Sequence, residues 1–275
     1  MNKASLKLIA QGRISDVYLR RQDEVVKLYH PTWPIKNIKT EQDKTKLLYE
    51  AGLPVPRVKG IESFDGRTGL VFEYIDGDSL LGILQKKPWK FYDLFSLLCR
   101  QHKRIHAYKL PSLPSQSRIL SEFIENSSEV SKVNKNKLIG FLNELSNDSV
   151  VCHGDFQPGN VLISKRGAVI IDWFNATSGS PLCDVARSFL SISIGAPPQN
   201  ASWLSLRIRD IGRSLLHPEK VYLRAYFENS QYSQSDLNKW ILIVAAARLG
   251  EAESNNENLG EEKEKLSKII QNIYP

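Results

Sequence analysis

The sequence changes its hydrophobic periodicity once, and this change constrains the fold more than any other feature. Up to Ile75 the chain consists of short β-prone runs around one helical segment. After the connector Asp76-Gly77-Asp78, most segments space their apolar residues as helices do. A run of strands followed by a run of helices is typical of the α+β class. We therefore predict a small antiparallel β lobe over residues 1–75, a hinge at about 73–78 and a larger, mostly helical lobe over 76–275.

The first lobe is predicted to hold five antiparallel strands and one helix. Asp65-Gly66 between two apolar runs indicates a hairpin, and Gly52 followed by Pro54 ends the helix. The predicted strands are Leu6–Ala10, Val17–Arg20, Val25–Tyr29, Val58–Phe64 and Thr68–Ile75, and the helix is Ile35–Ala51.

The second lobe is predicted to be helical apart from one strand-loop-strand segment, Val150–Asp172. Apolar residues recur at helical spacing before and after this segment. The predicted helices are Phe91–Tyr108, Ser117–Val130, Lys137–Leu145, Trp240–Ala252 and Glu261–Ile273. A cleft between two such lobes is where a ligand is expected.

Composition excludes several classes of protein. With 41% hydrophobic and 24% charged residues, the chain is an ordinary globular protein. Three scattered cysteines are too few for a disulfide framework or a zinc site, so we expect a reduced, cytoplasmic compartment. The apolar run Ile241–Ala247 is too short to cross a membrane. The net charge of +7 comes from basic residues interleaved with acids, which favours a solvated surface over a nucleic-acid or membrane partner.

The segment His153–Asn160 and the later Asp172 are typical of phosphoryl transfer. Asp155 is followed five residues later by Asn160, the spacing of a kinase catalytic loop, and Asp172 ends an apolar run. This chemistry needs a carboxylate to accept the proton of the attacking hydroxyl. It also needs an amide oxygen and a second carboxylate for Mg²⁺. The alternative is that both aspartates only cap loops, as most aspartates do. A fragment of another metal site is disfavoured because no second histidine follows at ligand spacing.

Six segments together resemble the aminoglycoside phosphotransferase and choline kinase group, the small-molecule branch of the protein-kinase-like fold. In chain order they read VVKLYH, EAGLPVPRV, LVFEYIDGDSL, HGDFQPGNVLI, IIDWFNATSGSPLCDVARS and VAAARLGEAE. The resemblance covers nearly the whole chain and implies a bilobal kinase-like fold. It also implies transfer of the γ-phosphate of ATP, or of GTP, to a hydroxyl of a small molecule.

The resemblance assigns roles to the residues of the catalytic segment. It implies that Asp155 is the base and that Asn160 and Asp172 bind Mg²⁺. His153 is expected to pack and hydrogen-bond beneath the loop, and Gln157 to lie near the transferring phosphate. Asp184, which starts a later helix, would anchor the catalytic loop or cap that helix.

Lys27 is the expected phosphate-binding lysine, by the same resemblance. It lies in an alternating strand, where a lysine usually faces outward. In kinase-like proteins the lysine at this place reaches the α- and β-phosphates and pairs with a helix glutamate. Glu41 is the best partner, because it shares a helical face with Thr45 and Leu48. Glu50 competes, but it lies at the end of the helix.

The rest of the nucleotide site is predicted from main-chain groups. The loop Gly12–Asp16 lacks the G-x-G-x-x-G pattern of protein kinases, so Ser15 is either a phosphate contact or part of an ordinary hairpin turn. The resemblance places the adenine at the Glu73 carbonyl and the Ile75 amide. Because main chain binds the base there, the sequence does not separate ATP from GTP.

The acceptor is left open by the sequence. A polycation would need a carboxylate-rich pocket, and an alkylammonium group would need aromatic rings. The candidate acids are Glu251, Glu253, Glu257, Glu261, Glu262 and Glu264, and the candidate rings are Trp203, Trp240, Tyr222 and Tyr226. Such rings at helical spacing are more often core. Two other functions compete: a nucleotide-binding sensor without turnover, and a protein kinase, which the missing Gly-rich loop and A-P-E segment disfavour.

Overall fold

The computed structural model describes residues 6–145, 148–195, 212–228, 230 and 232–271. Its contacts divide the chain into two compact units. The first lies within Met1–Trp89 and Pro158–Asn175, and the second within Lys90–Gln157, Ala176–Pro197 and Ser202–Pro275. The predicted hinge at about 73–78 stays a prediction.

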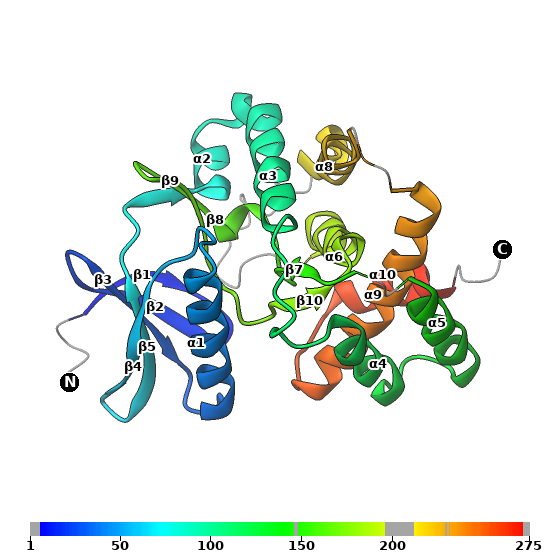
Figure 1. The fold of residues 1–275 in the computed structure, drawn as a ribbon, viewed down its shortest axis with the longest axis horizontal. Coiled ribbons are helices and arrows are strands. Elements are labelled where there is room, and N and C mark those ends of the chain that lie inside the picture. Colours follow the sequence, from blue (N-terminus) through cyan, green and yellow to red (C-terminus); the bar gives the residue numbers. More distant parts are fainter. Residues whose placement is uncertain (1–5, 146–147, 196–211, 229, 231, 272–275) are drawn as a thin grey trace. The chain divides into compact units, whose positions relative to one another are not determined.

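The first unit is built on a five-stranded antiparallel sheet with the order β1-β2-β3-β5-β4. One long helix, α1, packs against β4 and β5 (Figure 1). The bounds are β1 (Lys7–Gln11), β2 (Ser15–Arg21), β3 (Glu24–Tyr29), α1 (Ile35–Glu50), β4 (Val58–Phe64) and β5 (Arg67–Glu73). The predicted five strands and single helix are thus confirmed, with ends that differ by a few residues.

The alternation along β3 decides where Lys27 points. Val26 and Leu28 lie in one hydrophobic cluster of the unit. Tyr29 lies in the other, together with Ile38 of α1. Successive side chains of a strand face opposite sides, so Lys27 shares the side of Tyr29 and faces α1. Taken alone, the alternation along the strand suggests that Lys27 faces solvent. In the structure, the same alternation directs its ammonium toward α1.

A second, smaller sheet in the first unit has the order β6-β8-β9. It comprises β6 (Gly77–Ser79), β8 (Val161–Ser164) and β9 (Gly167–Ile170), with α2 (Leu80–Lys86) and 3-10 turns at Pro88–Lys90 and Pro158–Asn160. The sequence does not predict β6, because this short polar segment pairs with β8 through main chain alone. Gly77 permits the pairing, since a Cβ there would lie 2.3 Å from the Ile163 carbonyl oxygen.

The second unit is a helical assembly around α9, which packs against α4, α5, α6 and α10. Its helices are α3 (Phe91–Ile105), α4 (Gln116–Asn126), α5 (Lys132–Leu145), α6 (Pro181–Ile194), α8 (Pro218–Phe227), α9 (Gln234–Ser254) and α10 (Glu261–Gln271). Two short strands, β7 (Val150–Cys152) and β10 (Thr177–Gly179), pair with each other beside α6.

Several predicted helix ends are wrong. The helix predicted from Trp240 begins at Gln234, where the Ser233 hydroxyl accepts a hydrogen bond from the Asp236 N–H (3.0 Å). This capped first turn is polar, so apolar periodicity does not reveal it. The helix predicted to reach Val130 ends at Asn126, and the next begins at Lys132.

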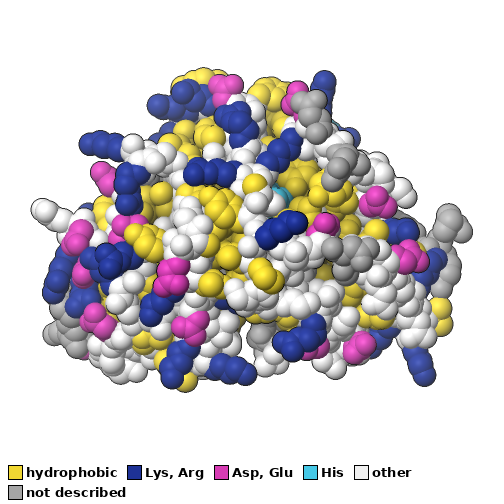
Figure 2. Space-filling model, viewed as in Figure 1, with side chains coloured by type: hydrophobic (Ala, Val, Ile, Leu, Met, Phe, Trp, Pro, Cys, Tyr) yellow, Lys and Arg dark blue, Asp and Glu magenta, His cyan; other side chains and the backbone are white. Residues whose placement is uncertain are grey.

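No helix in the described ranges combines the length and the apolar content that a bilayer crossing requires. On the face of the molecule drawn in Figure 2, basic side chains are interspersed with acidic ones. The prediction of a solvated surface, without a nucleic-acid or membrane partner, stays a prediction.

The close packing of α9 on α4 gives a stability prediction. A Cβ at Gly250 of α9 would lie 2.0 Å from the Phe123 carbonyl oxygen of α4. Gly250→Ala must therefore push the two helices apart, and we expect it to lower the free energy of unfolding by about 1–3 kcal/mol. Gly140→Ala in α5 is the matched control, because a Cβ there meets nothing within 4 Å. Chemical denaturation should show the control stabilised by about 0.5–1 kcal/mol. Equal stability of the two variants would contradict this packing.

Candidate active site

The first unit brings Lys27, Glu41 and Asp172 together. Lys27 Nζ donates to Glu41 Oε1 at 2.7 Å and to Asp172 Oδ1 at 2.8 Å. The other oxygen of Glu41 accepts a hydrogen bond from the Tyr29 hydroxyl at 2.7 Å. Glu41 is 1% exposed, whereas the side chain of Asp172 is 42% exposed. The lysine thus joins a buried carboxylate to one that a ligand can reach.

The charges in this cluster keep Lys27 protonated. Burial acts to lower the pKa of Lys27, but the carboxylates of Asp172 and Glu41 outweigh it and raise that pKa well above its usual value. Burial raises the pKa of Glu41, and Lys27 counteracts this effect. Burial also raises the pKa of Tyr29, which therefore stays a hydrogen-bond donor. The cluster is a fixed ammonium held between two acids.

Asp172 adopts a backbone conformation that its neighbours must maintain. Its φ of +68° lies in the left-handed region, which costs a non-glycine residue about 1 kcal/mol. On its N-terminal side, the Ile170 carbonyl accepts a hydrogen bond from the Trp173 indole at 2.8 Å. On its C-terminal side, Lys44 Nζ of α1 donates to the Phe174 carbonyl at 2.7 Å. The segment that carries Asp172 is therefore held on both sides.

Asn160 lies beside Asp172 in the same unit. The Ile171 N–H donates to the Asn160 carbonyl at 3.0 Å, so the two polar residues lie at adjoining ends of β8 and β9. Asn160 is 8% exposed. One carboxylate and one amide oxygen are ligands that suit Mg²⁺, which keeps several waters. The residues present therefore fit a magnesium ion.

The second unit holds Asp155 and Gln157. Gln157 Nε2 donates to both carboxylate oxygens of Asp155, at 3.2 and 3.1 Å. The Asp155 N–H donates to His153 Nδ1 at 3.2 Å, and His153 is fully buried. His153 therefore packs and hydrogen-bonds beneath the loop as expected, and Gln157 orients the carboxylate of Asp155.

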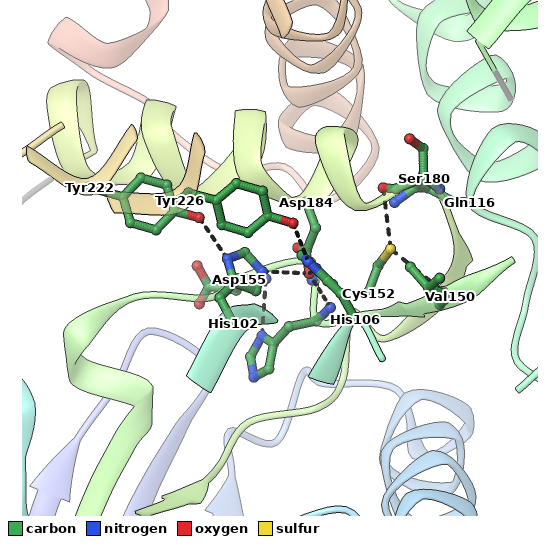
Figure 3. Close-up of polar contacts among 12 residues, drawn as sticks. His102, His106, Gln116, Val150, Cys152, Asp155, Ser180, Asp184, Tyr222 and Tyr226 are labelled. Carbon is green, nitrogen blue, oxygen red and sulfur yellow. Dashed lines mark hydrogen bonds and ion pairs between the residues drawn. The ribbon is translucent and has the colours of Figure 1, made fainter. Parts of the chain in front are cut away.

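Asp184 anchors the backbone in front of Asp155. It accepts a hydrogen bond from the His153 N–H at 2.6 Å and from the Gly154 N–H at 2.8 Å. Ser180 is the N-cap residue of α6, which has no side-chain cap bond. Of the two expectations for Asp184, the structure thus shows the anchor. His102 of α3 and His106, the C-cap residue of α3, also contact its carboxylate (Figure 3).

The remaining nucleotide residues lie in the first unit. Ser15 is 5% exposed, and its carbonyl accepts the Gly12 N–H at 2.9 Å, which closes a tight turn. The Glu73 N–H donates to the Arg57 carbonyl, and the Ile75 amide has no hydrogen-bond partner within the described parts of the chain. The phosphate contact of Ser15 and the adenine contacts of Glu73 and Ile75 stay predictions.

The candidate acceptor acids are mostly engaged with the chain itself. Glu251 binds Arg187 of α6 at 2.6 Å, and Glu257 makes a bidentate pair with Arg248 at 2.8 and 2.6 Å. Glu262 lies 3.3 Å from the same Arg248. Glu253 accepts hydrogen bonds from Ser127 and Ser128, whereas Glu261 and Glu264 are exposed on α10.

The candidate aromatic rings belong to the core. Trp240 is 1% exposed, Tyr222 is fully buried and Tyr226 is 3% exposed. These three rings therefore do not form an open cage for a cation. Trp203 lies outside the described residues.

Sequence reasoning missed His102, His106 and Lys44. The two histidines are four residues apart at the end of α3 and its C-cap, a spacing that puts them on one helix face. Tyr222 and Tyr226 of α8 have the same spacing. Two polar pairs, each four residues apart, were therefore the sequence pattern that could have indicated this network. Lys44 follows Glu41 by three residues on the same face of α1, but no local pattern reveals that its partner is a carbonyl from residue 174.

Several solved structures have a fold similar to that of this chain. An aminoglycoside phosphotransferase APH(4)-Ia, solved with ADP and hygromycin B, superposes with a TM-score of 0.62 at 14% identity over 99% of this chain and 95% of that one. Amicoumacin kinase hAmiN, with AMP-PNP, Ca²⁺ and Ami, has a TM-score of 0.60 at 12% identity over 98% and 88%. The APH(3'')-Id enzyme from Streptomyces rimosus has a TM-score of 0.56 at 14% identity over 89% and 93%.

These similarities define the fold class: the protein has the protein-kinase-like fold, with a small antiparallel β lobe and a larger helical lobe. Among curated proteins, no sequence relative matches the chain. A family model matches residues 5–217, and the chain belongs to that family, the phosphotransferase enzyme family. It is therefore a kinase, as its fold and motifs predict.

Lys44 gives a pH-dependent prediction. Burial lowers the pKa of Lys44 to about 8 from its ordinary 10.5, so the folded state disfavours the ammonium. Between these two pH values the unfolded state binds more protons, and the free energy of unfolding rises with pH. We expect a contribution of about 3 kcal/mol from pH 7.5 to 10.5, at about 1.4 kcal/mol per pKa unit.

Urea denaturation of wild type and Lys44→Met across this range measures the effect. The variant should lack the rise, whereas Lys46→Met, an exposed position of the same helix, should keep it. A parallel pH profile for wild type and Lys44→Met would show that Lys44 titrates normally.

Proposed function

We propose that this protein is a small-molecule kinase that transfers the γ-phosphate of ATP, or of GTP, to a hydroxyl group, with Asp155 as the base. The observation that carries the proposal is the contact of Lys27 with both Glu41 and Asp172, at 2.7 and 2.8 Å. Three segments distant in the sequence meet there. An ammonium fixed beside an accessible carboxylate is what a metal-bound triphosphate requires.

Lys27 would bind the phosphates of the nucleotide. Glu41, which also accepts a hydrogen bond from Tyr29, holds the Lys27 ammonium from the buried side, so its remaining donor capacity is directed toward Asp172 and any ligand there. The main chain at Glu73 and Ile75 would bind the adenine, and the Ile75 amide is available for this purpose among the described residues.

Asn160 and Asp172 would hold Mg²⁺. When bound, Mg²⁺ would supply neutralisation of the charge on the nucleotide phosphates. The structure supports this assignment through the Ile171–Asn160 main-chain hydrogen bond and the exposure of Asp172. Lys44 and Trp173 keep the Asp172 segment in its left-handed conformation, so the carboxylate is preorganised for a ligand.

Asp155 would accept the proton of the acceptor hydroxyl as the hydroxyl oxygen attacks the phosphate. Gln157 restricts the rotation of its carboxylate by two hydrogen bonds, and the anchored backbone before it restricts its position. Asp155 precedes Asn160 by five residues on one continuous segment, which supports their action in one reaction. A base oriented in this way typically contributes about 10²–10⁴-fold to the rate.

Substitution of Asp155 and substitution of Asp172 should impair different steps, phosphoryl transfer and metal-dependent nucleotide binding respectively. Asp155→Asn should lower kcat for phosphoryl transfer by about 10²–10⁴-fold while the Kd for Mg·ATP stays near wild type. Asp172→Asn should weaken ATP binding about tenfold or more in the presence of Mg²⁺, with little change in its absence. Isothermal titration calorimetry with and without Mg²⁺ and a coupled ADP-release assay measure both effects.

Asp93→Asn, an exposed position of α3, is the control and should behave as wild type. Turnover retained by Asp155→Asn would contradict the assignment of Asp155 as the base. An ATP affinity of Asp172→Asn that depends on Mg²⁺ as in wild type would contradict the assignment of Asp172 as a magnesium ligand.

An acceptor screen tests the function as a whole. We expect ADP release with ATP or GTP to depend on at least one hydroxyl compound from a panel of aminoglycosides, choline-like alcohols, amino alcohols and sugars, confirmed by mass spectrometry of the product. Mg·ATP binding without any turnover would favour a nucleotide sensor. Phosphate transfer to protein, with none to the panel, would favour a protein kinase.

A further inference from the structure

A buried hydrogen-bond network joins three helices behind the catalytic loop. Nε2 of His102 on α3 and Nε2 of His106, the C-cap residue of α3, lie 3.0 and 3.2 Å from the same oxygen of Asp184 on α6. Their Nδ1 atoms lie 2.6 and 2.7 Å from the hydroxyls of Tyr222 and Tyr226 on α8. Figure 3 shows the two tyrosines and the two histidines converging on Asp184.

Four donors meet the carboxylate of Asp184. The His153 N–H and the Nε2 atoms of both histidines lie against Oδ2, and the Gly154 N–H donates to Oδ1. An ionised carboxylate only accepts hydrogen bonds, so each Nε2 carries its proton toward Asp184 and each Nδ1 accepts from a tyrosine. His102, His106 and Asp184 also have the types and spacing of metal ligands, but a cation there would have to displace these donors.

The charge state agrees with this arrangement. Burial, aided by His106, lowers the pKa of His102 to about 3, so its ring is neutral. Burial raises the pKa of Asp184, but its interactions with His102 and His106 outweigh this effect and hold that pKa well below its usual value. Asp184 is thus a buried anion that hydrogen-bond donors stabilise.

His102 differs from His106 in one contact. Its ring stacks on Phe156, with centroids 4.0 Å apart and planes at 14°. Phe156 is fully buried and directly follows Asp155 in the chain. Among the described ring contacts, His106 has none with Phe156. His102 therefore supports the catalytic loop on both sides of Asp155. Through Asp184 it holds the backbone of His153 and Gly154, and its own ring packs on Phe156.

We propose that His102, oriented by Tyr222, is a positioning residue for Asp155, whereas His106 and Tyr226 serve the stability of the fold. This inference rests on the proposed role of Asp155 as the base. A displacement of about 1 Å in a reacting group can cost about 10²-fold in rate, so releasing one side of the loop should lower kcat and leave nucleotide binding intact.

Two matched pairs of variants test the inference. His102→Gln and His106→Gln both keep an amide donor for Asp184, but only the first loses the stack on Phe156. Tyr222→Phe and Tyr226→Phe each remove one hydroxyl and preserve the ring, so they remain usable if a histidine variant does not fold. For each variant, kcat and KM for ATP are measured by phosphate release from Mg·ATP to water, together with Tm.

We expect His102→Gln to lower kcat by about tenfold or more with KM for ATP within about twofold, while His106→Gln stays within about threefold of wild-type kcat. Tyr222→Phe should lower kcat more than Tyr226→Phe. All four should lower Tm, because each disturbs a buried hydrogen bond. Hydrogen exchange of the segment 150–158 should rise more in His102→Gln than in His106→Gln.

Equal loss of kcat in the two members of each pair, in proportion to Tm, would overturn the positioning role. Stoichiometric zinc or iron in the purified protein, lost in His106→Gln, would overturn the hydrogen-bond assignment. Asp155→Asn is assayed in parallel: if it retains turnover, the base assignment fails. If it abolishes turnover while the paired variants match each other, only the present inference fails.

Discussion

The first unit depends on one compensated buried charge, the carboxylate of Glu41. A carboxylate that is 1% exposed is costly by several kcal/mol unless it is paired and hydrogen-bonded, and Lys27 and Tyr29 together meet that requirement. Lys27 also reaches Asp172, so one ammonium links β3, α1 and the segment after β9. Loss of Lys27 would leave the buried carboxylate of Glu41 without its ion-pair partner, so Lys27 stabilises the unit in addition to its proposed role in binding phosphate.

The second unit also contains a buried carboxylate, that of Asp184, but stabilises it with hydrogen bonds and, among the described residues, without a lysine. Asp184 is 1% exposed and meets no lysine or arginine in the contacts described. Its oxygens are bound by two main-chain N–H groups and two imidazoles. Those main-chain groups belong to the loop that carries Asp155. In each unit, then, a buried carboxylate fixes the backbone or side chain that bears the candidate chemistry.

The acceptor side shows why counts of charged residues do not define a pocket. In sequence, the acids of α9, of α10 and of the segment between them suggest a surface for a polycation. In the structure, Arg187 and Arg248 bind Glu251, Glu257 and Glu262. These pairs join α6, α9 and the start of α10. The carboxylates are thus used largely to hold helices together, and selectivity for an acceptor must come from other groups.

Local patterns were sufficient for much of the protein. The period-two runs and the Asp65-Gly66 turn predicted the five-stranded sheet, and the spacing of Asp155, Asn160 and Asp172 predicted a kinase, because these features involve residues near one another in the chain. The roles of the three residues stay proposals. Tertiary structure alone decided that Lys27 faces α1, that Lys44 holds the Phe174 carbonyl, that β6 pairs with β8, and that His102 supports the catalytic loop from both sides. Each of these depends on a partner 14 to 130 residues away, and a periodicity carries no information about which distant group will meet a side chain once the core has packed.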